Sequence, residues 1–147
     1  MSEFQINLFT EIDQLFLDST FKICPYNWYQ LFNFFGYIKK KEFYIPLCYV
    51  LMSSKNEELY LEVFYQLKKF ISAHNKNFTL SGNKIMSDLE LGMRKAIKAS
   101  FELCKLQVCY FHFCKAIWNK IKKLHLFKKA YRVYYVNSFY YKSISIY

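Results

Sequence analysis

Two aspartates offer the most direct chemistry in this sequence. Asp18 lies inside an otherwise apolar stretch, although aspartate is depleted in β-strands and is costly to bury without a partner. Asp88 follows a short apolar run and precedes a helical pattern. If the two carboxylates face each other they repel, unless a divalent cation neutralises them, and hard oxygen ligands suit Mg²⁺ or Mn²⁺. Such ions could activate a water or a hydroxyl for in-line phosphoryl transfer.

Each aspartate also has a simpler interpretation. Asp88 stands directly before a helical pattern and would be a good N-cap, and caps are commoner than metal ligands. Asp18 could end its strand with a side chain that reaches solvent or accepts hydrogen bonds from nearby backbone amides. Neither residue alone indicates catalysis, so the question depends on the elements that position them.

Cys109 and His112 form a second candidate pair, with the spacing C-x-x-H. Cys104 and Cys114 lie nearby, but the combined spacing matches no common structural zinc pattern. In a strand, positions 109 and 112 point to opposite faces, which disfavours joint binding of an ion unless the strand ends between them. We therefore expect no zinc site here, and the role of the pair stays open.

The chain is strongly basic, with a formal net charge of +10. No acidic residue follows Glu102, whereas this part of the chain includes Lys115, Lys120, Lys122 and Lys123 beside aromatic residues. These four lysines are candidate nucleic-acid-binding residues, because neutralising a polyanion releases counterions. A solvated face of a lysine-rich helix would give the same pattern.

Composition limits the fold class and the location. The 147 residues are 54% hydrophobic and 22% aromatic, which excludes extensive disorder and fits one domain. No apolar run approaches the roughly 18 residues of a membrane-spanning helix, and the N-terminus lacks the pattern of a secretion signal. Five cysteines without such a signal predict reduced thiols. We expect an intracellular protein with no membrane contact.

Hydrophobic periodicity predicts the elements that carry the aspartates. Strand patterns cover residues 14–23, 28–38, 45–52, 84–87 and 105–111. Helical patterns begin at Ser54, which has capping-box spacing with Glu57, at Asp88, and after Phe111. The order β-β-β-α-β-α-β-α predicts an α/β fold. The ribonuclease H-like fold has this order, with its first and fourth strands adjacent in a mixed sheet, and by analogy Asp18 and Asp88 would converge.

Four stretches share motifs with one family. They are residues 17–25 with 29–31, 45–52 with 55–60, 85–90 with 96–97, and 109–113 with 115–118. In this order they resemble the strand, acid and C-x-x-H motifs of the transposase domain of Mutator-like elements, the MULE domain, which is a DDE-type transposase of ribonuclease H-like fold. Ser19 stands where that family usually has glycine. The likeness covers residues 14–126.

The resemblance implies that Asp18 and Asp88 are the first two catalytic acids and ligands of Mg²⁺ or Mn²⁺, with DNA as substrate and a nuclear location. The family's third acid is a glutamate nearer the C-terminus, and no Asp or Glu follows Glu102, so we expect a truncated fragment that is inactive alone. Its organisation would be a lead-in at 1–13, a domain at 14–126 that is incomplete at its C-terminus, and a divergent basic and aromatic tail at 127–147.

Two other functions stay open. A non-catalytic nucleic-acid-binding module on the same fold would use the lysines near the C-terminus, and it predicts a salt-dependent DNA affinity. A protein-interaction role would use an unfinished sheet edge and exposed aromatic side chains, through self-association or through a partner that supplies the missing elements.

Overall fold

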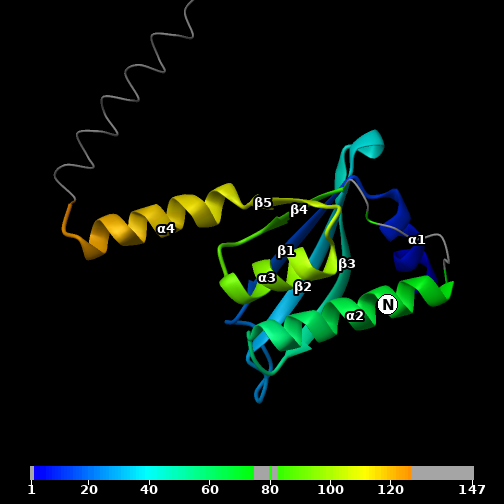
Figure 1. The fold of residues 1–147 in the computed structure, drawn as a ribbon, viewed down its shortest axis with the longest axis horizontal. Helices are drawn as coiled ribbons and strands as arrows, with labels where there is room; N and C mark the ends of the chain where they lie inside the picture. The colour runs from blue at the N-terminus through cyan, green and yellow to red at the C-terminus, as the bar shows by residue number, and fades with distance from the viewer. Residues whose placement is uncertain (1, 75–79, 81–82, 127–147) are drawn as a thin grey trace, which may run out of the picture. The chain divides into compact units, whose positions relative to one another are not determined.

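In the computed structural model, which describes residues 2–74, 80 and 83–126, the chain forms a mixed α/β fold built on a five-stranded sheet (Figure 1). The strands are β1 (Gln14–Thr20), β2 (Gln30–Ile38), β3 (Phe43–Met52), β4 (Lys84–Ser87) and β5 (Lys105–Val108). The helices are α1 (Glu3–Glu11), α2 (Glu57–His74), α3 (Leu91–Ser100) and α4 (Tyr110–Lys123), and a 3-10 turn, η1, spans Lys39–Lys41. The element order predicted from the sequence is confirmed, apart from α1, which was missed.

The chain divides into two compact units, residues 1–109 and 110–147. The first contains the whole sheet with α1, α2 and α3, and the second begins with α4. The strand predicted over 105–111 ends at Val108, so its last part was wrong: Tyr110 and Phe111 belong to α4. The tail predicted at 127–147 lies outside the described residues.

The sheet has the strand order β3-β2-β1-β4-β5. β1 pairs antiparallel with β2 and parallel with β4, so β1 lies at the centre and its expected pairing with the fourth strand is confirmed. β2 pairs antiparallel with β3, and β4 pairs parallel with β5. Because β3 lies at an edge of the sheet, it tolerates Pro46, which has no backbone N–H to donate.

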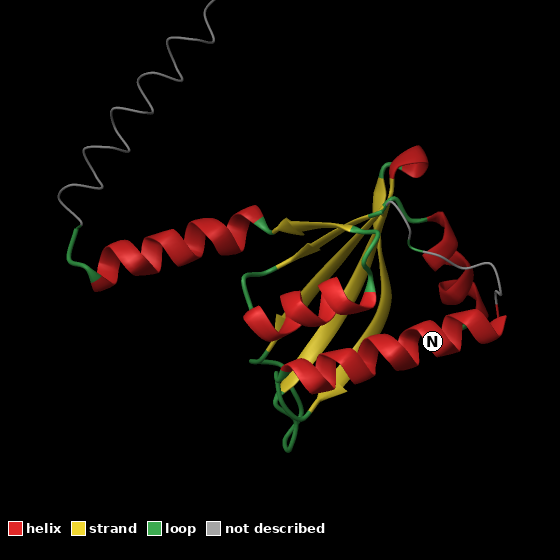
Figure 2. Ribbon diagram, viewed as in Figure 1, coloured by secondary structure: helices red, strands yellow, loops and turns green. Residues whose placement is uncertain are grey.

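The hydrophobic core lies between one face of the sheet and the helices α1, α2 and α3 (Figure 2). Alternation along β1 buries Leu15 and Leu17 on this face and turns the intervening residues to the other. Phe32 and Phe34 of β2 meet Phe64 of α2 edge to face, with ring centroids 6.1 and 6.2 Å apart. The sequence pattern of a central strand and two amphipathic helices therefore produces a one-sided core.

α1 extends this core where β1 begins. Ser2 and Gln5 form a capping box at its start, and Ile6 and Phe9 are buried. The side chain of Ile12 packs against Gly36 of β2 so closely that a residue with a Cβ atom would not fit at position 36. The segment 1–13, expected as a lead-in, is part of the folded unit, and the S-x-x-Q spacing was the signal for its helix.

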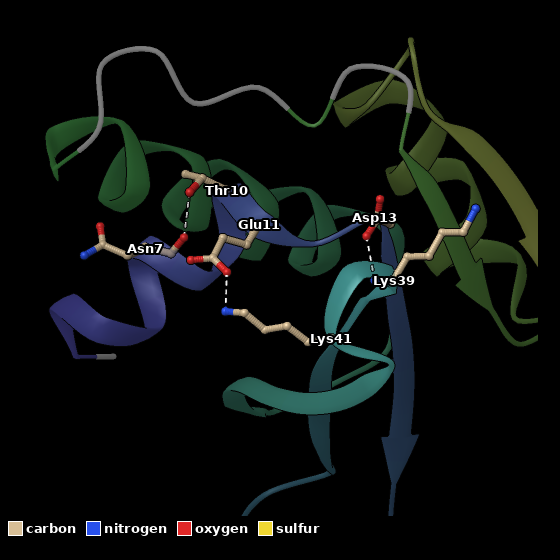
Figure 3. Close-up of polar contacts among 6 residues, drawn as sticks. All are labelled: Asn7, Thr10, Glu11, Asp13, Lys39 and Lys41. Atoms are coloured by element: carbon tan, nitrogen blue, oxygen red, sulfur yellow. Dashed lines mark hydrogen bonds and ion pairs between the residues drawn. The ribbon is translucent and has the colours of Figure 1, made fainter.

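Polar contacts also stabilise the end of the sheet where β1 begins (Figure 3). The backbone N–H of Lys39 donates to Oδ2 of Asp13 at 2.7 Å, and Nζ of Lys41 forms an ion pair with Oε2 of Glu11 at 2.7 Å. The hydroxyl of Thr10 donates to the backbone oxygen of Asn7 at 2.6 Å. These contacts tie η1 to α1 and to the start of β1.

The start of α2 differs from the prediction. The N–H of Leu59 donates to Oδ1 of Asn56 at 3.0 Å, so Asn56 caps the helix. The capping box predicted for Ser54 and Glu57 was wrong. The backbone oxygen of Ser54 instead accepts a hydrogen bond from the Gln30 side chain at 3.3 Å.

Candidate functional site

Asp18 lies in β1, and Asp88 directly follows the neighbouring strand β4. In the parallel pair, Leu17 of β1 is in register with Ser87, the last residue of β4. Asp18 and Asp88 each follow that pair by one residue, and Leu17 and Ser87 are both buried on the helical side. Side chains alternate along a strand, so Asp18 inside β1 turns toward the other face of the sheet, whereas Asp88 lies just beyond the end of β4. The register therefore brings the backbones at positions 17 and 87 side by side, and the approach of the two carboxylates stays a prediction.

A hydrogen bond fixes the turn that carries Asp88. The N–H of Glu90 donates to Oδ1 of Asp88 at 2.8 Å, which closes an Asx-turn. α3 begins three residues after Asp88, and the residue at its N-cap is Glu90, whose side chain makes no capping bond. The alternative interpretation of Asp88 as an N-cap was therefore wrong, and its carboxylate lies in the loop between β4 and α3.

Arg94 of α3 braces the same loop. Its guanidinium donates to the hydroxyl of Ser87 at 3.3 Å and to the backbone oxygen of Gln107 at 3.4 Å. These two contacts join the end of β4 to β5. Arg94 therefore stabilises the backbone next to Asp88.

A buried polar network lies on the helical side of this region. Gln30 and Tyr60 are both fully buried, and Nε2 of Gln30 donates to the Tyr60 hydroxyl oxygen at 2.9 Å. Burial raises the pKa of Tyr60, against the opposing effect of hydrogen bonding with Ser19 and Gln30. The neutral phenol thus connects α2 to β1 and β2, beside the residue that follows Asp18.

Glu90 adds a third acidic residue to the region. Burial raises its pKa, a hydrogen bond with Tyr60 opposes the rise, the negative charge of Asp88 adds to it, and Lys55 opposes it. Sequence reasoning missed both Glu90 and Tyr60. The position of Glu90, two residues after Asp88, could have indicated its role, whereas Tyr60 has the pattern of an ordinary core residue.

Cys109 and His112 fall in different elements. Cys109 follows β5, and its N–H donates to the backbone oxygen of Ser87 at 2.8 Å, whereas His112 lies in the first turn of α4. Across residues 2–74, 80 and 83–126, no three His, Cys, Asp or Glu side chains gather so that they could hold a metal ion. The role of Cys109 and His112 stays open.

Lys115, Lys120, Lys122 and Lys123 are exposed on α4. Nζ of Lys115 lies 5.8 Å from the ring centroid of Phe111, and Nζ of Lys122 lies 5.5 Å from that of Trp118. Two of the four lysines on this helix, Lys115 and Lys122, therefore place their ammonium groups near aromatic rings. Their assignment to nucleic-acid binding remains a prediction.

The fold and the site together define a class of protein: an α/β domain in which two aspartates follow the last residue pair of two parallel strands, β1 and β4, within a mixed sheet. The family model of the MULE transposase domain matches residues 14–116, more than two thirds of the chain. This chain belongs to the MULE transposase domain family. A comparison with curated proteins found no match. Within the described stretches, no helix combines the length and the apolar character needed to cross a bilayer.

Proposed function

We propose that this chain is a DDE-type transposase domain of ribonuclease H-like fold, in which Asp18 and Asp88 bind Mg²⁺ or Mn²⁺ for phosphoryl transfer on DNA in the nucleus. The observation that carries the proposal is the parallel register of β1 with β4, with one acid directly after the Leu17–Ser87 pair on each strand. The strand order and the family membership support it.

The residues present suit such an ion. Carboxylate oxygens are hard ligands, and the charge of Asp88 already acts unfavourably on the charged form of Glu90, so a bound cation would relieve a local excess of negative charge. A bound divalent ion would activate the attacking oxygen and stabilise the leaving one. Among the protein groups, the Glu90 amide orients the Asp88 carboxylate and Arg94 holds the strand ends that carry it.

The number of acidic residues available as metal ligands limits the expected DNA-cleaving activity. Residues 103–147 contain no Asp or Glu, so these 147 residues offer Asp18 and Asp88 but no acid in the C-terminal part that would correspond to the family's third one. Two carboxylates hold a divalent ion weakly and cannot fix a pair of ions. We therefore expect this chain alone to bind Mn²⁺ or Mg²⁺ without cleaving DNA.

Metal binding is tested by calorimetric titration of Mn²⁺ into the wild-type chain and three variants. Asp18→Asn and Asp88→Asn should each weaken Mn²⁺ binding at least about tenfold, because each removes one anionic ligand. Asp13→Asn is the matched control, since it makes the same change at the opposite end of β1 and should leave the affinity unchanged. Equal Mn²⁺ affinity in wild type and Asp18→Asn would contradict the proposal.

The expected inactivity has a separate test. Supercoiled plasmid incubated with the chain and Mg²⁺ or Mn²⁺ should remain intact. Nicking that disappears in Asp18→Asn would overturn the inactivity and support the role of the acid pair at the same time. Nicking that persists in Asp18→Asn and Asp88→Asn would count against that role.

A non-catalytic DNA-binding function is the second candidate, favoured by the exposure of the four lysines on α4. Each phosphate contact contributes about 0.9 to the slope of log affinity against log salt concentration for duplex DNA. Lys120→Ala with Lys123→Ala should therefore reduce that slope by up to about 2. The affinity of Asp18→Asn for duplex DNA should equal that of the wild type under this function.

A further inference from the structure

The face of the sheet opposite the helices carries aromatic and lysine side chains in two registered rows. The first row crosses the sheet through Tyr44, Tyr37, Gln14, Lys84 and Lys105. The second runs through Phe35, Phe16, Met86 and Gln107. Nε2 of Gln14 donates to Oε1 of Gln107 at 3.2 Å, across β4, which shows that both rows face the same side.

The aromatic members of this face contact one another. The ring of Tyr44 lies 5.4 Å from that of Phe16 and 4.8 Å from that of Tyr37, and the ring of Phe35 lies 6.2 Å from that of Tyr49, centroid to centroid. We call these five residues the open aromatic face. Tyr44 is 65% exposed and Tyr49 is 54% exposed, so both rings are accessible in the described part of the chain.

Positive charge borders the open aromatic face on β4 and β5. Lys84 and Lys105 are in register with each other, and both are exposed. Neither takes part in an ion pair within the described residues. On the same face, Asp18 follows Phe16 by two positions along β1. One surface therefore combines accessible rings, unneutralised ammonium groups and one of the candidate catalytic acids.

We propose that this surface binds single-stranded DNA, with unpaired bases stacked on Tyr44 and Tyr49 and with backbone phosphates against Lys84 and Lys105. Every base has a flat face that stacks on an aromatic ring, and a duplex hides those faces. The inference rests on the proposed function in one respect: Asp18 shares the surface, so a bound strand would lie beside the acid pair.

Charge favours nucleic acid over the other occupant of an exposed sheet face, a second copy of the chain. Each copy carries a net charge of +10, so two copies repel, whereas a phosphate backbone is attracted. Two lysines in line with the rings complement a chain of phosphates, whereas an identical face would bring two like-charged lysines for its one aspartate, Asp18.

The test measures fluorescence anisotropy of three labelled probes: an oligo(dT) strand of about 20 nucleotides, an abasic strand of equal length, and a blunt duplex. Wild type should prefer oligo(dT) to both other probes. The double variant Tyr44→Ala/Tyr49→Ala should bind oligo(dT) at least about tenfold more weakly, with its affinity for the abasic strand unchanged. Tyr65→Ala is the matched control, because Tyr65 is 57% exposed on α2, on the helical side.

The lysines are tested by salt dependence on the same oligo(dT) probe. Lys84→Ala/Lys105→Ala should reduce the slope of log affinity against log salt by about 1.4, since each single-strand phosphate contact contributes about 0.7. Lys98→Ala, a change of the same kind on an exposed residue of α3, should reduce it by less.

Two results would overturn the inference. One is an oligo(dT) affinity of Tyr44→Ala/Tyr49→Ala equal to that of the wild type, with circular dichroism showing both folded. The other is a wild-type dimer in size-exclusion chromatography that Tyr44→Ala dissociates, which would assign the face to a second copy. The proposed function fails separately, through unchanged Mn²⁺ binding in Asp18→Asn, while oligo(dT) binding persists.

Discussion

Acidic residues lie at both ends of the central strand β1, but their surroundings differ. At the amino end, Asp13 accepts a hydrogen bond from the Lys39 amide at 2.7 Å, and Glu11 pairs with Lys41 (Figure 3). At the other end, the position of Asp18 adjoins that of Asp88, and burial together with the charge of Asp88 raises the pKa of Glu90.

This comparison distinguishes acidic residues whose contacts stabilise the fold from acidic residues whose charges reduce its stability. A carboxylate that accepts an N–H bond or faces a lysine gains more from folding than it loses in hydration. At the other end Asp88 also accepts an N–H bond, from Glu90 at 2.8 Å, but burial and the charge of Asp88 raise the pKa of the Glu90 carboxyl and so disfavour its charged form. Mutations at the amino end of β1 should therefore lower stability, and neutralising mutations at the other end should raise it.

Gly36→Val should have the largest effect on stability and confirm that the amino end is a packed structural region. The side chain of Ile12 occupies the space that a Cβ at position 36 would need, and overpacking a core typically costs about 1–3 kcal/mol. Urea unfolding measures the change. Tyr37→Phe, at the next position and on the open face, is the control and should change the unfolding free energy little. A neutral Gly36→Val would mean that Ile12 moves aside.

Asp13→Ala and Asp88→Asn should change stability in opposite directions without metal. Asp13→Ala removes the acceptor of the Lys39 N–H and should lower the free energy of unfolding by about 1 kcal/mol. Asp88→Asn keeps an oxygen for the Glu90 N–H but removes a charge, so the free energy of unfolding should rise slightly. With Mn²⁺ added, the wild type and Asp13→Ala should gain more stability than Asp88→Asn. If the free energy of unfolding fell for both variants in metal-free urea titrations, the proposed difference between the two ends of β1 would be wrong.

The sequence predicted the strands that position Asp18 and Asp88, because the evidence for those strands is local. Leu15 to Leu17 form a continuous apolar run, as central strands do, and β4 has the bounds that its pattern predicts, residues 84–87. The end of β5 was missed, because Tyr110 and Phe111 have strand propensity. In the fold, β4 ends at Ser87 in register with Val108, so a longer β5 would have no partner beyond it on that side.

Contacts between distant residues could not be predicted in the same way. The hydrogen bond from Gln30 to Tyr60 joins β2 to α2 across thirty positions, and nothing in either local pattern indicates it. The Asx-turn at Asp88 was missed for a different reason, since an aspartate before a helix has the same sequence signature whether it caps the helix or closes the turn.

Glu90→Gln should reveal the cost of gathered acids through its pH dependence. Burial and the charge of Asp88 raise the pKa of Glu90 above its ordinary 4.5, so the folded state prefers the neutral form. The contribution of this group to stability is then present below its unfolded pKa and is lost as pH rises through the folded pKa. Glu90→Gln should raise Tm at pH 7, by less than Asp13→Ala lowers it, and should have no effect well below pH 4.5. An increase of equal size at both pH values would show that the charge is not the cause.

Lys41→Met should have the smallest effect, which tests how much of the stability at the amino end comes from charge. The ion pair with Glu11 is short, at 2.7 Å, but its side chains are 49% and 47% exposed, so water and salt screen it. A double-mutant cycle with Glu11→Gln should give a coupling energy below about 1 kcal/mol, and the coupling should fall at high salt. A larger coupling that persists in salt would mean that the pair, and not the Asp13 hydrogen bond with the packing of Ile12 on Gly36, holds this end of the sheet.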